Sequence, residues 1–211
     1  MQRLVIKTID EFCRATASDS FYPGGGCVSA LAGALSGSLG QMVLALTIGK
    51  KKYAEHEPVL KTVLPEMEKA ATELLLCVER DAEGCEGLLA AMGLPKDTDE
   101  QKAKRKQAMA EATRRANDAP LAVVGHAMQL LRLFAAHVGK VNQNAITDWA
   151  VGTHQAFAAL EGAAYNVMIN VGGVGDPEYA ATTRTHIEAQ VAEGRRLFEQ
   201  VREQVWRQLL G

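Results

Sequence analysis

The spacing of apolar residues along this chain predicts helices from one end to the other. Near the C-terminus, apolar positions recur every three or four residues, at Ile187, Val191, Gly194, Phe198, Val201 and Val205. This is the period of an amphipathic helix, and no segment shows the alternation of a half-buried strand. Glycine, proline and capping residues divide the pattern into predicted helices over residues 8–18, 26–48, 58–92, 98–117, 120–138, 147–171 and 182–210. We therefore expect one all-α domain over residues 1–211, a multi-helix antiparallel bundle.

The predicted helix over residues 26–48 lacks a polar face. Residues 20–49 carry no charge and could cross a bilayer by length, but serine, glutamine and threonine dilute their apolar character. We therefore expect no membrane contact and a helix buried on all sides, within the protein or between subunits. Small residues such as Gly33 and Gly37 would let neighbouring helices approach closely. Because a bundle of this size rarely hides a helix completely, we expect a homodimer with this helix central or at the interface.

The composition narrows the class of function. Apolar residues make up 47% of the chain and aromatic residues 5%, so alanine, leucine, valine and methionine must form most of a helical core. A net charge of −2 gives no sign of nucleic-acid binding. The 4 cysteines and 5 histidines show no CxxC, HxH or HExxH spacing, so no metal site is expected. With no export signal in view, we expect a cytoplasmic protein with reduced thiols.

One carboxylate interrupts an apolar face of the predicted helix over residues 58–92. Asp81 lies between Val78 and Cys85 in a stripe that is otherwise apolar. A carboxylate on a core face is unfavourable unless it is paired, hydrogen-bonded or protonated. Asp81 is therefore either a structural residue, capping a helix or pairing with an arginine, or a carboxylate held in a cleft for chemistry.

Amide side chains lie near both ends of the predicted helix over residues 147–171. Asn166 and Asn170, one turn apart near its C-terminus, could bind an amide-rich heterocycle or satisfy the glycine turn that follows. Asn142 and Asn144 precede its N-terminus. The second pair belongs to a polar turn that could serve a ligand or only shape the chain.

The start of this predicted helix also carries a hydroxyl and a carboxylate. Thr147 or Asp148 is a natural N-cap, which is the structural interpretation. A helix N-terminus also favours an anion, which leaves a binding role open.

Two further segments are candidates for ligand contact. The run Gly24, Gly25, Gly26 lets backbone N–H groups approach a ligand closely, although a flexible loop explains it equally and it matches no nucleotide-binding motif. The run Lys50, Lys51, Lys52 follows the uncharged helix, where cations are favoured at a helix C-terminus. It is either a solvated end or a receptor for an acidic tail.

Several segments, taken in order, resemble the cyclodeaminase/cyclohydrolase family of folate enzymes, which includes the formiminotransferase-cyclodeaminase C-terminal domain and the methenyltetrahydrofolate cyclohydrolases. They are PGGG (23–26) with VSALAGALSGSLGQMV (28–43), LTIGKKKY (46–53), DAEGCEGLLAAMGLPKDTDEQKAKR (81–105), NQNAITD (142–148) and NVMIN (166–170). LTIGKKKY and the second asparagine of NQN look like the cyclohydrolase branch. The resemblance covers nearly the whole chain.

The resemblance implies an all-α homodimer that acts on tetrahydrofolate without any other cofactor. Its expected activity is interconversion of 5,10-methenyl- and 10-formyl-tetrahydrofolate. The alternatives are a cyclodeaminase that releases ammonia from 5-formimino-tetrahydrofolate and a homologue that binds folate without turnover. Asp81 and Asp148 would be the catalytic carboxylates. The other residues would bind substrate: the three glycines, the three lysines, Asn142, Asn144, Asn166 and Asn170.

The chain departs from the family pattern at a few positions. Cys27 stands where serine or another small residue is usual, and Val141 replaces an expected glycine before Asn142. Thr147 replaces a usual serine, and Gly172-Gly173 stands where a basic residue is common. One charged contact to folate is therefore expected to be missing or moved.

Overall fold

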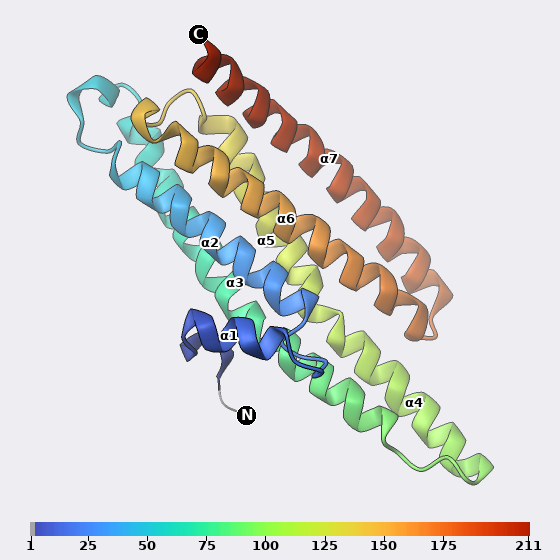
Figure 1. Cartoon of the computed structure of the whole chain (residues 1–211). Helices are drawn as coiled ribbons and strands as arrows, with labels where there is room; N and C mark the ends of the chain where they lie inside the picture. The colour runs from blue at the N-terminus through green and yellow to red at the C-terminus, as the bar shows by residue number, and fades with distance from the viewer. Residues whose placement is uncertain (1–2) are drawn as a thin grey trace.

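Seven α-helices and four single-turn 3-10 helices account for most of residues 3–211, the part of the chain that the computed structural model describes (Figure 1). The α-helices are α1 (Ile9–Thr16), α2 (Gly25–Ala45), α3 (Glu57–Met92), α4 (Asp99–Ala116), α5 (Asp118–His137), α6 (Ile146–Asn170) and α7 (Pro177–Leu210). The 3-10 helices are η1 (Leu4–Ile6), η2 (Lys51–Tyr53), η3 (Gln143–Ala145) and η4 (Val171–Gly173). No strand occurs within these residues, and the all-α prediction is confirmed.

Two threonines begin helices as their sequence context predicts. The Thr8 side chain accepts a hydrogen bond from the N–H of Glu11 (3.3 Å), and the Glu11 carboxylate accepts one from the N–H of Thr8 (2.8 Å). Thr98 and Gln101 form the same reciprocal pair at the start of α4. These capping boxes satisfy N–H groups that a helix start leaves free, and they fix where α1 and α4 begin.

Two other predicted boundaries are wrong for local reasons. α7 begins at Pro177, before the predicted residue 182, because the Asp176 carboxylate caps it by accepting a hydrogen bond from the N–H of Tyr179 (3.0 Å). Only Asn117 separates α4 from α5, so the predicted interruption at residues 118–120 is shorter and lies earlier in the chain. Pro120 falls in the first turn of α5, where a missing N–H leaves no helical hydrogen bond unmade.

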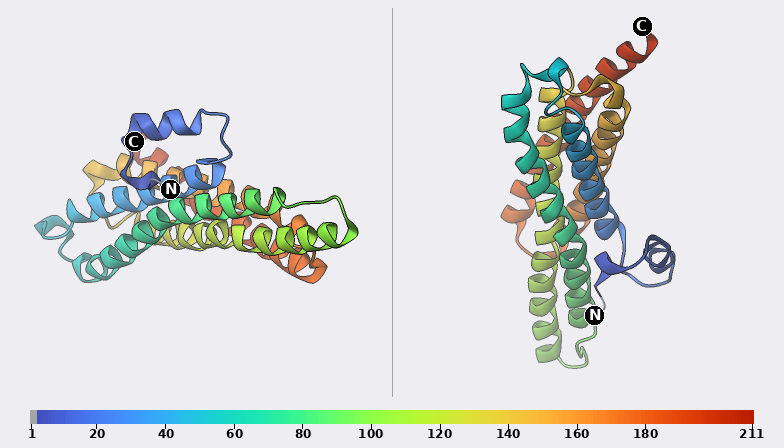
Figure 2. Two further views of the ribbon diagram at one scale, coloured as in Figure 1. Left: turned by 90° about the horizontal axis from the view of Figure 1, so that it is seen from below. Right: turned by 90° about the vertical axis from the view of Figure 1, so that its left-hand side faces the viewer.

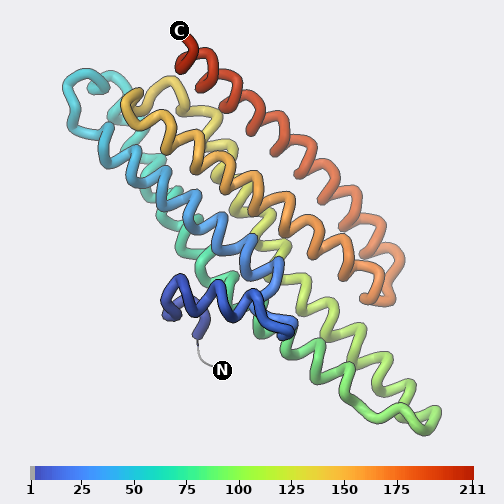
Figure 3. The backbone as a smooth tube through the Cα atoms, viewed as in Figure 1, coloured from blue at the N-terminus to red at the C-terminus, as the bar shows by residue number. Residues whose placement is uncertain are grey.

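The helices run side by side in an elongated bundle. α2 makes most of its contacts with α3 and α6, while α5 packs against α3 and α6, and α7 against α5 and α6 (Figure 1). The C-terminal part of α3 and α4 form a hairpin that extends past the end of the other helices (Figure 3). α1 crosses the bundle on one side and projects from it (Figure 2).

The small residues of α2 allow close helix contacts, as the sequence predicts. A Cβ on Gly33 would lie 2.9 Å from Cδ2 of Leu74, and one on Gly37 would lie 2.8 Å from Cβ of Ala71. Both neighbours belong to α3, so a larger residue at either position would push the two helices apart. On its other side, α2 bonds to α6 through the Ser36 hydroxyl, which donates to the carbonyl of Gly152 (2.7 Å).

One face of α2 remains uncovered in the single chain. Val28, Leu35 and Met42 lie one heptad apart on this face, and Leu35 is 53% exposed. The adjacent helix α6 adds exposed apolar residues, among them Val151 and Ile169. The single chain therefore does not bury α2 on all sides, because no described element packs over this face. Burial of this face between subunits stays a prediction.

Two helical segments are apolar and long enough to span a membrane by length and composition alone. They are Gly25–Ala45 and the nearly continuous Asp99–His137, and in each 56% of the apolar window is buried in the protein. Such burial is typical of the core helices of a bundle, so the two segments give only weak support for a membrane span.

Candidate functional site

Asp81 lies against the first turn of α2, directly after the glycine run. The thiol of Cys27 lies 3.2 Å from Oδ2 of Asp81 and donates to it, and the backbone N–H of Cys27 also favours the charge of this carboxylate. A Cβ on Gly26 would overlap the carboxyl group. Gly26 is therefore required as glycine because the Asp81 carboxyl occupies the space beside its Cα.

The environment of Asp81 favours its protonated form. Burial raises the pKa of the Asp81 carboxyl, while the two hydrogen bonds from Cys27 oppose part of that increase. No lysine, arginine or histidine forms an ion pair with Asp81 within residues 3–211. The arginine-pairing form of the structural interpretation is therefore wrong, whereas the contact with the first turn of α2 fits its helix-capping form. The raised pKa makes the carboxylate a stronger base than a surface aspartate.

Asn166 extends the same cluster from α6. Its Nδ2 donates to the carbonyl of Gly162 (2.8 Å), and a Cβ on Gly25 would lie 3.6 Å from this Nδ2. Asn170 is half-buried one turn further on, at the end of α6. Gly24, the N-cap of α2, also lies at this end of the site.

A second cluster forms at the opposite end of α2, around Asn142. The N–H of Asn142 donates to the Thr47 hydroxyl (2.8 Å), and its Nδ2 donates to the carbonyl of Leu46 (3.0 Å). Its Oδ1 accepts a hydrogen bond from the N–H of Asn144 (3.1 Å) and a longer one from the Tyr53 hydroxyl (3.4 Å). These bonds shape the turn, and the role of Asn142 in substrate binding remains a prediction.

The start of α6 differs from the predicted one. Ala145 is the N-cap, and Thr147 and Asp148 lie inside the first turn. The cause is η3, which precedes α6 directly and is capped by Asn142. Asp148 is half-buried and Asn144 is exposed, so both lie near the surface at this end of the bundle.

The three lysines belong to this second cluster. Lys50, Lys51 and Lys52 are exposed on the segment that joins α2 to α3, and Lys52 Nζ lies 5.5 Å from the centre of the Tyr53 ring. α2 ends at Ala45, earlier than predicted, and Gly49 with φ of 80° turns the chain before the lysines. The lysines therefore lie beside the Asn142 turn.

The two clusters are too far apart to act on one reacting atom within a single chain. α2 has 21 residues, which at about 1.5 Å per residue makes it about 30 Å long. Asp81 contacts its first turn, while Asn142 contacts residues just beyond its last turn. Asp81 and Asp148, which the sequence pairs in one mechanism, thus lie near opposite ends of the bundle.

Three residues that hold these clusters were not among the predicted site residues. They are Cys27, Thr47 and Tyr53; the last two stand in the segment LTIGKKKY, which supports the resemblance but predicts no site role for them. Cys27 could have been found by its place in the first turn after the glycine run, next to a helix N-terminus. Thr47 and Tyr53 could not, because their contacts with Asn142 join residues that are 95 and 89 positions apart in the chain.

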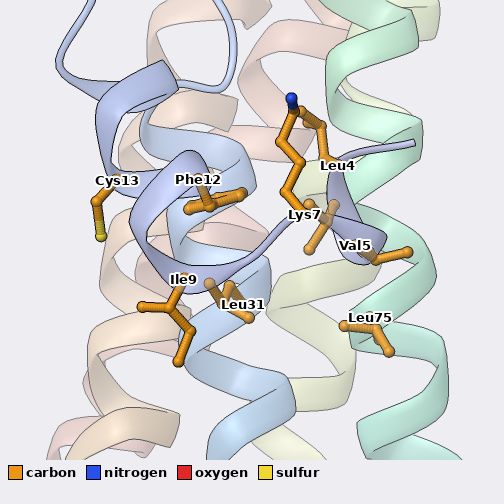
Figure 4. Close-up of a pocket in the computed structure, with 9 residues that line it drawn as sticks. Leu4, Val5, Lys7, Ile9, Phe12, Cys13, Leu31 and Leu75 are labelled. Atoms are coloured by element: carbon orange, nitrogen blue, oxygen red, sulfur yellow. The ribbon is translucent and has the colours of Figure 1, made fainter. Parts of the chain in front are cut away.

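An apolar pocket of about 220 Å³ lies between the N-terminal segment and helices α2 and α3 (Figure 4). Apolar side chains such as Leu4, Phe12 and Leu31 line it, together with Lys7 and Cys13, and it contains no carboxylate. A pocket of this composition can seat an apolar group, but it has no carboxylate to attract a cation or to act as a base. It is therefore not the candidate reaction site. Within residues 3–211, no three histidine, cysteine or acidic side chains are grouped as a metal site would need.

Comparison with known proteins identifies the family. The family model described as formiminotransferase-cyclodeaminase matches residues 8–189. The chain belongs to this family. A formiminotransferase-cyclodeaminase family member from Methylorubrum extorquens, named methenyltetrahydrofolate cyclohydrolase, is 38% identical, and the match covers 94% of this chain and 96% of that protein.

Two further proteins similar to this chain are longer or more distant. The formimidoyltransferase-cyclodeaminase of Gallus gallus is 32% identical over 91% of this chain, and the match spans 36% of that protein. A crystal structure of formiminotetrahydrofolate cyclodeaminase from Thermotoga maritima has a TM-score of 0.87 and is 23% identical, covering 98% of this chain and 100% of that one. At this identity the similarity establishes the shared fold.

Proposed function

We propose that this protein is a methenyltetrahydrofolate cyclohydrolase, which interconverts 5,10-methenyltetrahydrofolate and 10-formyltetrahydrofolate. One observation carries the proposal: the end-to-end match, at 38% identity, with the Methylorubrum extorquens protein of that name. The match with the Gallus gallus protein is weaker, at 32%, and covers 36% of its length. We further propose that the enzyme works in the cytoplasm and uses no cofactor beyond its folate substrate.

The chemistry of this reaction calls for a base and a polar surround. Methenyltetrahydrofolate is a cation, and a water oxygen bonds to its one-carbon bridge. The bond from that carbon to N5 then breaks, with its electron pair remaining on N5. Of the two water protons, one ends on N5 and the other is released, which leaves a neutral formyl group on N10. A carboxylate can take the first proton from water and can also stabilise the cation.

Asp81 is suited to act as this base. Its pKa is raised by burial, so its carboxylate binds a proton more readily than a surface aspartate does at the same pH. Its negative charge has no cationic partner among the described residues and would attract the cationic substrate. The glycines beside it, Gly24, Gly25 and Gly26, present little side-chain bulk and would let the flat pterin ring approach the backbone.

The remaining predicted residues would bind the substrate from both clusters. Asn166 and Asn170 lie on the Asp81 side, where their amides could bond the edge of the pterin. Asp148 and Asn144 lie on the other side, together with the three lysines. Those lysines would attract the acidic glutamate tail of folate through exposed contacts worth about 1 kcal/mol or less per pair.

A homodimer would bring the two clusters together. The uncovered apolar face of α2 is centred near Leu35, with Val28 and Met42 seven residues to either side. Two copies joined on this face with α2 antiparallel to its mate would be related by a two-fold axis. The N-terminal end of α2 in one copy would then lie beside the C-terminal end of α2 in the other. Asp81 of one chain would in this way approach the Asp148 cluster of its mate.

The proposed activity is tested by absorbance. Purified protein is added to 5,10-methenyltetrahydrofolate, and the loss of the methenyl chromophore is compared with the spontaneous rate. We expect loss above that rate, and no ammonia from 5-formiminotetrahydrofolate. Ammonia release in the second assay would favour the cyclodeaminase activity, for which the Gallus gallus relative is named. Folate binding without turnover in either assay would identify a non-catalytic homologue.

A further inference from the structure

Cys27, on α2, donates a hydrogen bond to the carboxylate of Asp81, which lies on α3. It is the third residue of α2, it is 0% exposed, and its Sγ lies 3.2 Å from Oδ2 of Asp81 and 3.4 Å from the carbonyl oxygen of Val78. A thiol has one proton to donate, so these two acceptors compete for it. The Cys27 backbone N–H also lowers the pKa of this carboxyl, so the side chain and the backbone of one residue both favour its charge.

The thiol of Cys27 is held in its protonated, donating form. Burial and the adjacent Asp81 charge both raise the pKa of Cys27 well above that of a free cysteine. The other titratable groups near Asp81 are the thiols of Cys77 and Cys85, and burial raises the pKa of each, with a smaller contribution from the Asp81 charge. All three thiols therefore remain neutral near neutral pH, and the carboxylate carries the local charge.

We infer that Cys27 is a positioning residue, which holds the Asp81 carboxylate against the first turn of α2 and sets how readily it takes up a proton. A thiol is a weaker donor than a hydroxyl. It orients the carboxylate yet stabilises its charge less than a serine would, which leaves the group more basic. The inference rests on the proposed function, in which Asp81 takes a proton from water.

Two substitutions at this position should act in opposite directions. Cys27→Ser supplies a stronger donor, and the acidic limb of the kcat/KM profile for methenyl loss should move to lower pH. Cys27→Ala removes the side-chain donor, and the same limb should move to higher pH. A purely structural role for Cys27 would change the amount of active enzyme but would leave the midpoint of this limb unchanged. Cys85→Ser is the matched control, because Cys85 lies one helical turn from Asp81 and does not bond to its carboxylate.

A second measurement does not depend on turnover. The protein is labelled with carboxyl-¹³C aspartate, and the Asp81 signal, assigned by its absence in Asp81→Asn, is titrated by NMR in each variant. We expect the midpoint of Asp81 to fall in Cys27→Ser, to rise in Cys27→Ala and to stay unchanged in Cys85→Ser. Equal midpoints in all folded variants would overturn the inference. Shifted midpoints in a protein whose Asp81→Asn variant retains full activity would instead support the Cys27 contact and refute the role of Asp81 in turnover.

Discussion

The Asp81 carboxyl and the Cα of Gly26 are in direct contact, and no side chain at position 26 fits between them. The preceding glycine has no such restriction, since a Cβ on Gly25 would lie 3.6 Å from Nδ2 of Asn166, an ordinary contact distance. The glycine run therefore contains residues with different roles. Gly26 makes room for a carboxylate that enters from α3, whereas Gly25 only leaves α2 open at its start.

This difference predicts opposite effects of two alanine substitutions. Gly26→Ala should lower the free energy of unfolding by roughly 1–3 kcal/mol, because the new methyl group overlaps the half-buried Asp81 carboxyl. Gly25→Ala should be neutral or stabilising by up to about 1 kcal/mol, since alanine has less backbone freedom to lose in a helix. Urea denaturation of both variants measures the difference. Equal stabilities would contradict the contact between Gly26 and Asp81.

Replacement of Asp81 should remove most of the activity. Asp81→Asn keeps the shape of the side chain but cannot take up a proton, so turnover of methenyltetrahydrofolate should fall by about 10² or more. Glu86→Gln serves as the control, because Glu86 is an exposed acid on the same helix. An Asp81→Asn variant that is folded and fully active would exclude Asp81 from the mechanism.

The same substitution should stabilise the fold at neutral pH. Burial raises the folded-state pKa of Asp81, so its protonation favours the folded chain. The contribution is fully present below the unfolded-state pKa and is lost as pH rises through the raised folded-state pKa. The Asp81→Asn variant has no carboxyl group to ionise at this position, so its stability does not fall in this way as pH rises. We expect its Tm to exceed that of the unsubstituted protein by more at pH 8 than at pH 4; a constant difference across this range would disprove the assignment.

Two inactive variants should restore activity when mixed, if the site is shared between chains. Asp81→Asn and Asp148→Asn homodimers each lack one carboxylate in both sites. After unfolding and joint refolding, random pairing makes half of the dimers hybrids, and each hybrid has one intact site of two. About a quarter of the original activity should therefore return. Sites contained within single chains would give no recovery, and sedimentation equilibrium would establish whether the chains pair at all.

The lysines beside the Asn142 turn should act on binding and not on chemistry. Replacing Lys50, Lys51 and Lys52 by glutamine should raise KM for a polyglutamylated substrate several-fold at low salt and leave kcat unchanged, because exposed pairs are worth about 1 kcal/mol or less each. The difference should shrink in high salt as the charges are screened. The same change at Lys102, Lys104 and Lys106 on α4 is the matched control for net charge.

The sequence predicts most of the helices because their signals are local. The capping boxes at Thr8 and Thr98 involve residues three positions apart in the chain. Gly33 and Gly37 need only a neighbouring helix that packs closely against the α2 backbone. The predicted start of α6 is wrong for a local reason too. Asn142 caps a separate 3-10 turn, and α6 begins at Ile146, directly after that turn, so Thr147 lies inside the helix and is not its N-cap.

The candidate site was less predictable, because its geometry depends on where segments meet in space. The apolar stripe on α3 indicates that Asp81 faces the core, yet nothing near it in sequence reveals that its partner is Cys27, 54 residues away. Similarly, Asp81 and Asp148 look alike as candidates, and only the direction of α2 shows that they lie at opposite ends of the bundle.

The apolar face of α2 also bears on how the protein behaves when diluted. If this face is the contact between the two chains of a dimer, association stabilises the folded chains. Their stability then depends on the protein concentration. The unfolding midpoint of a dilute sample would then be lower than that of a concentrated one. A newly synthesised chain would expose this apolar face until it dimerised. During that time, binding to a second copy would compete with aggregation.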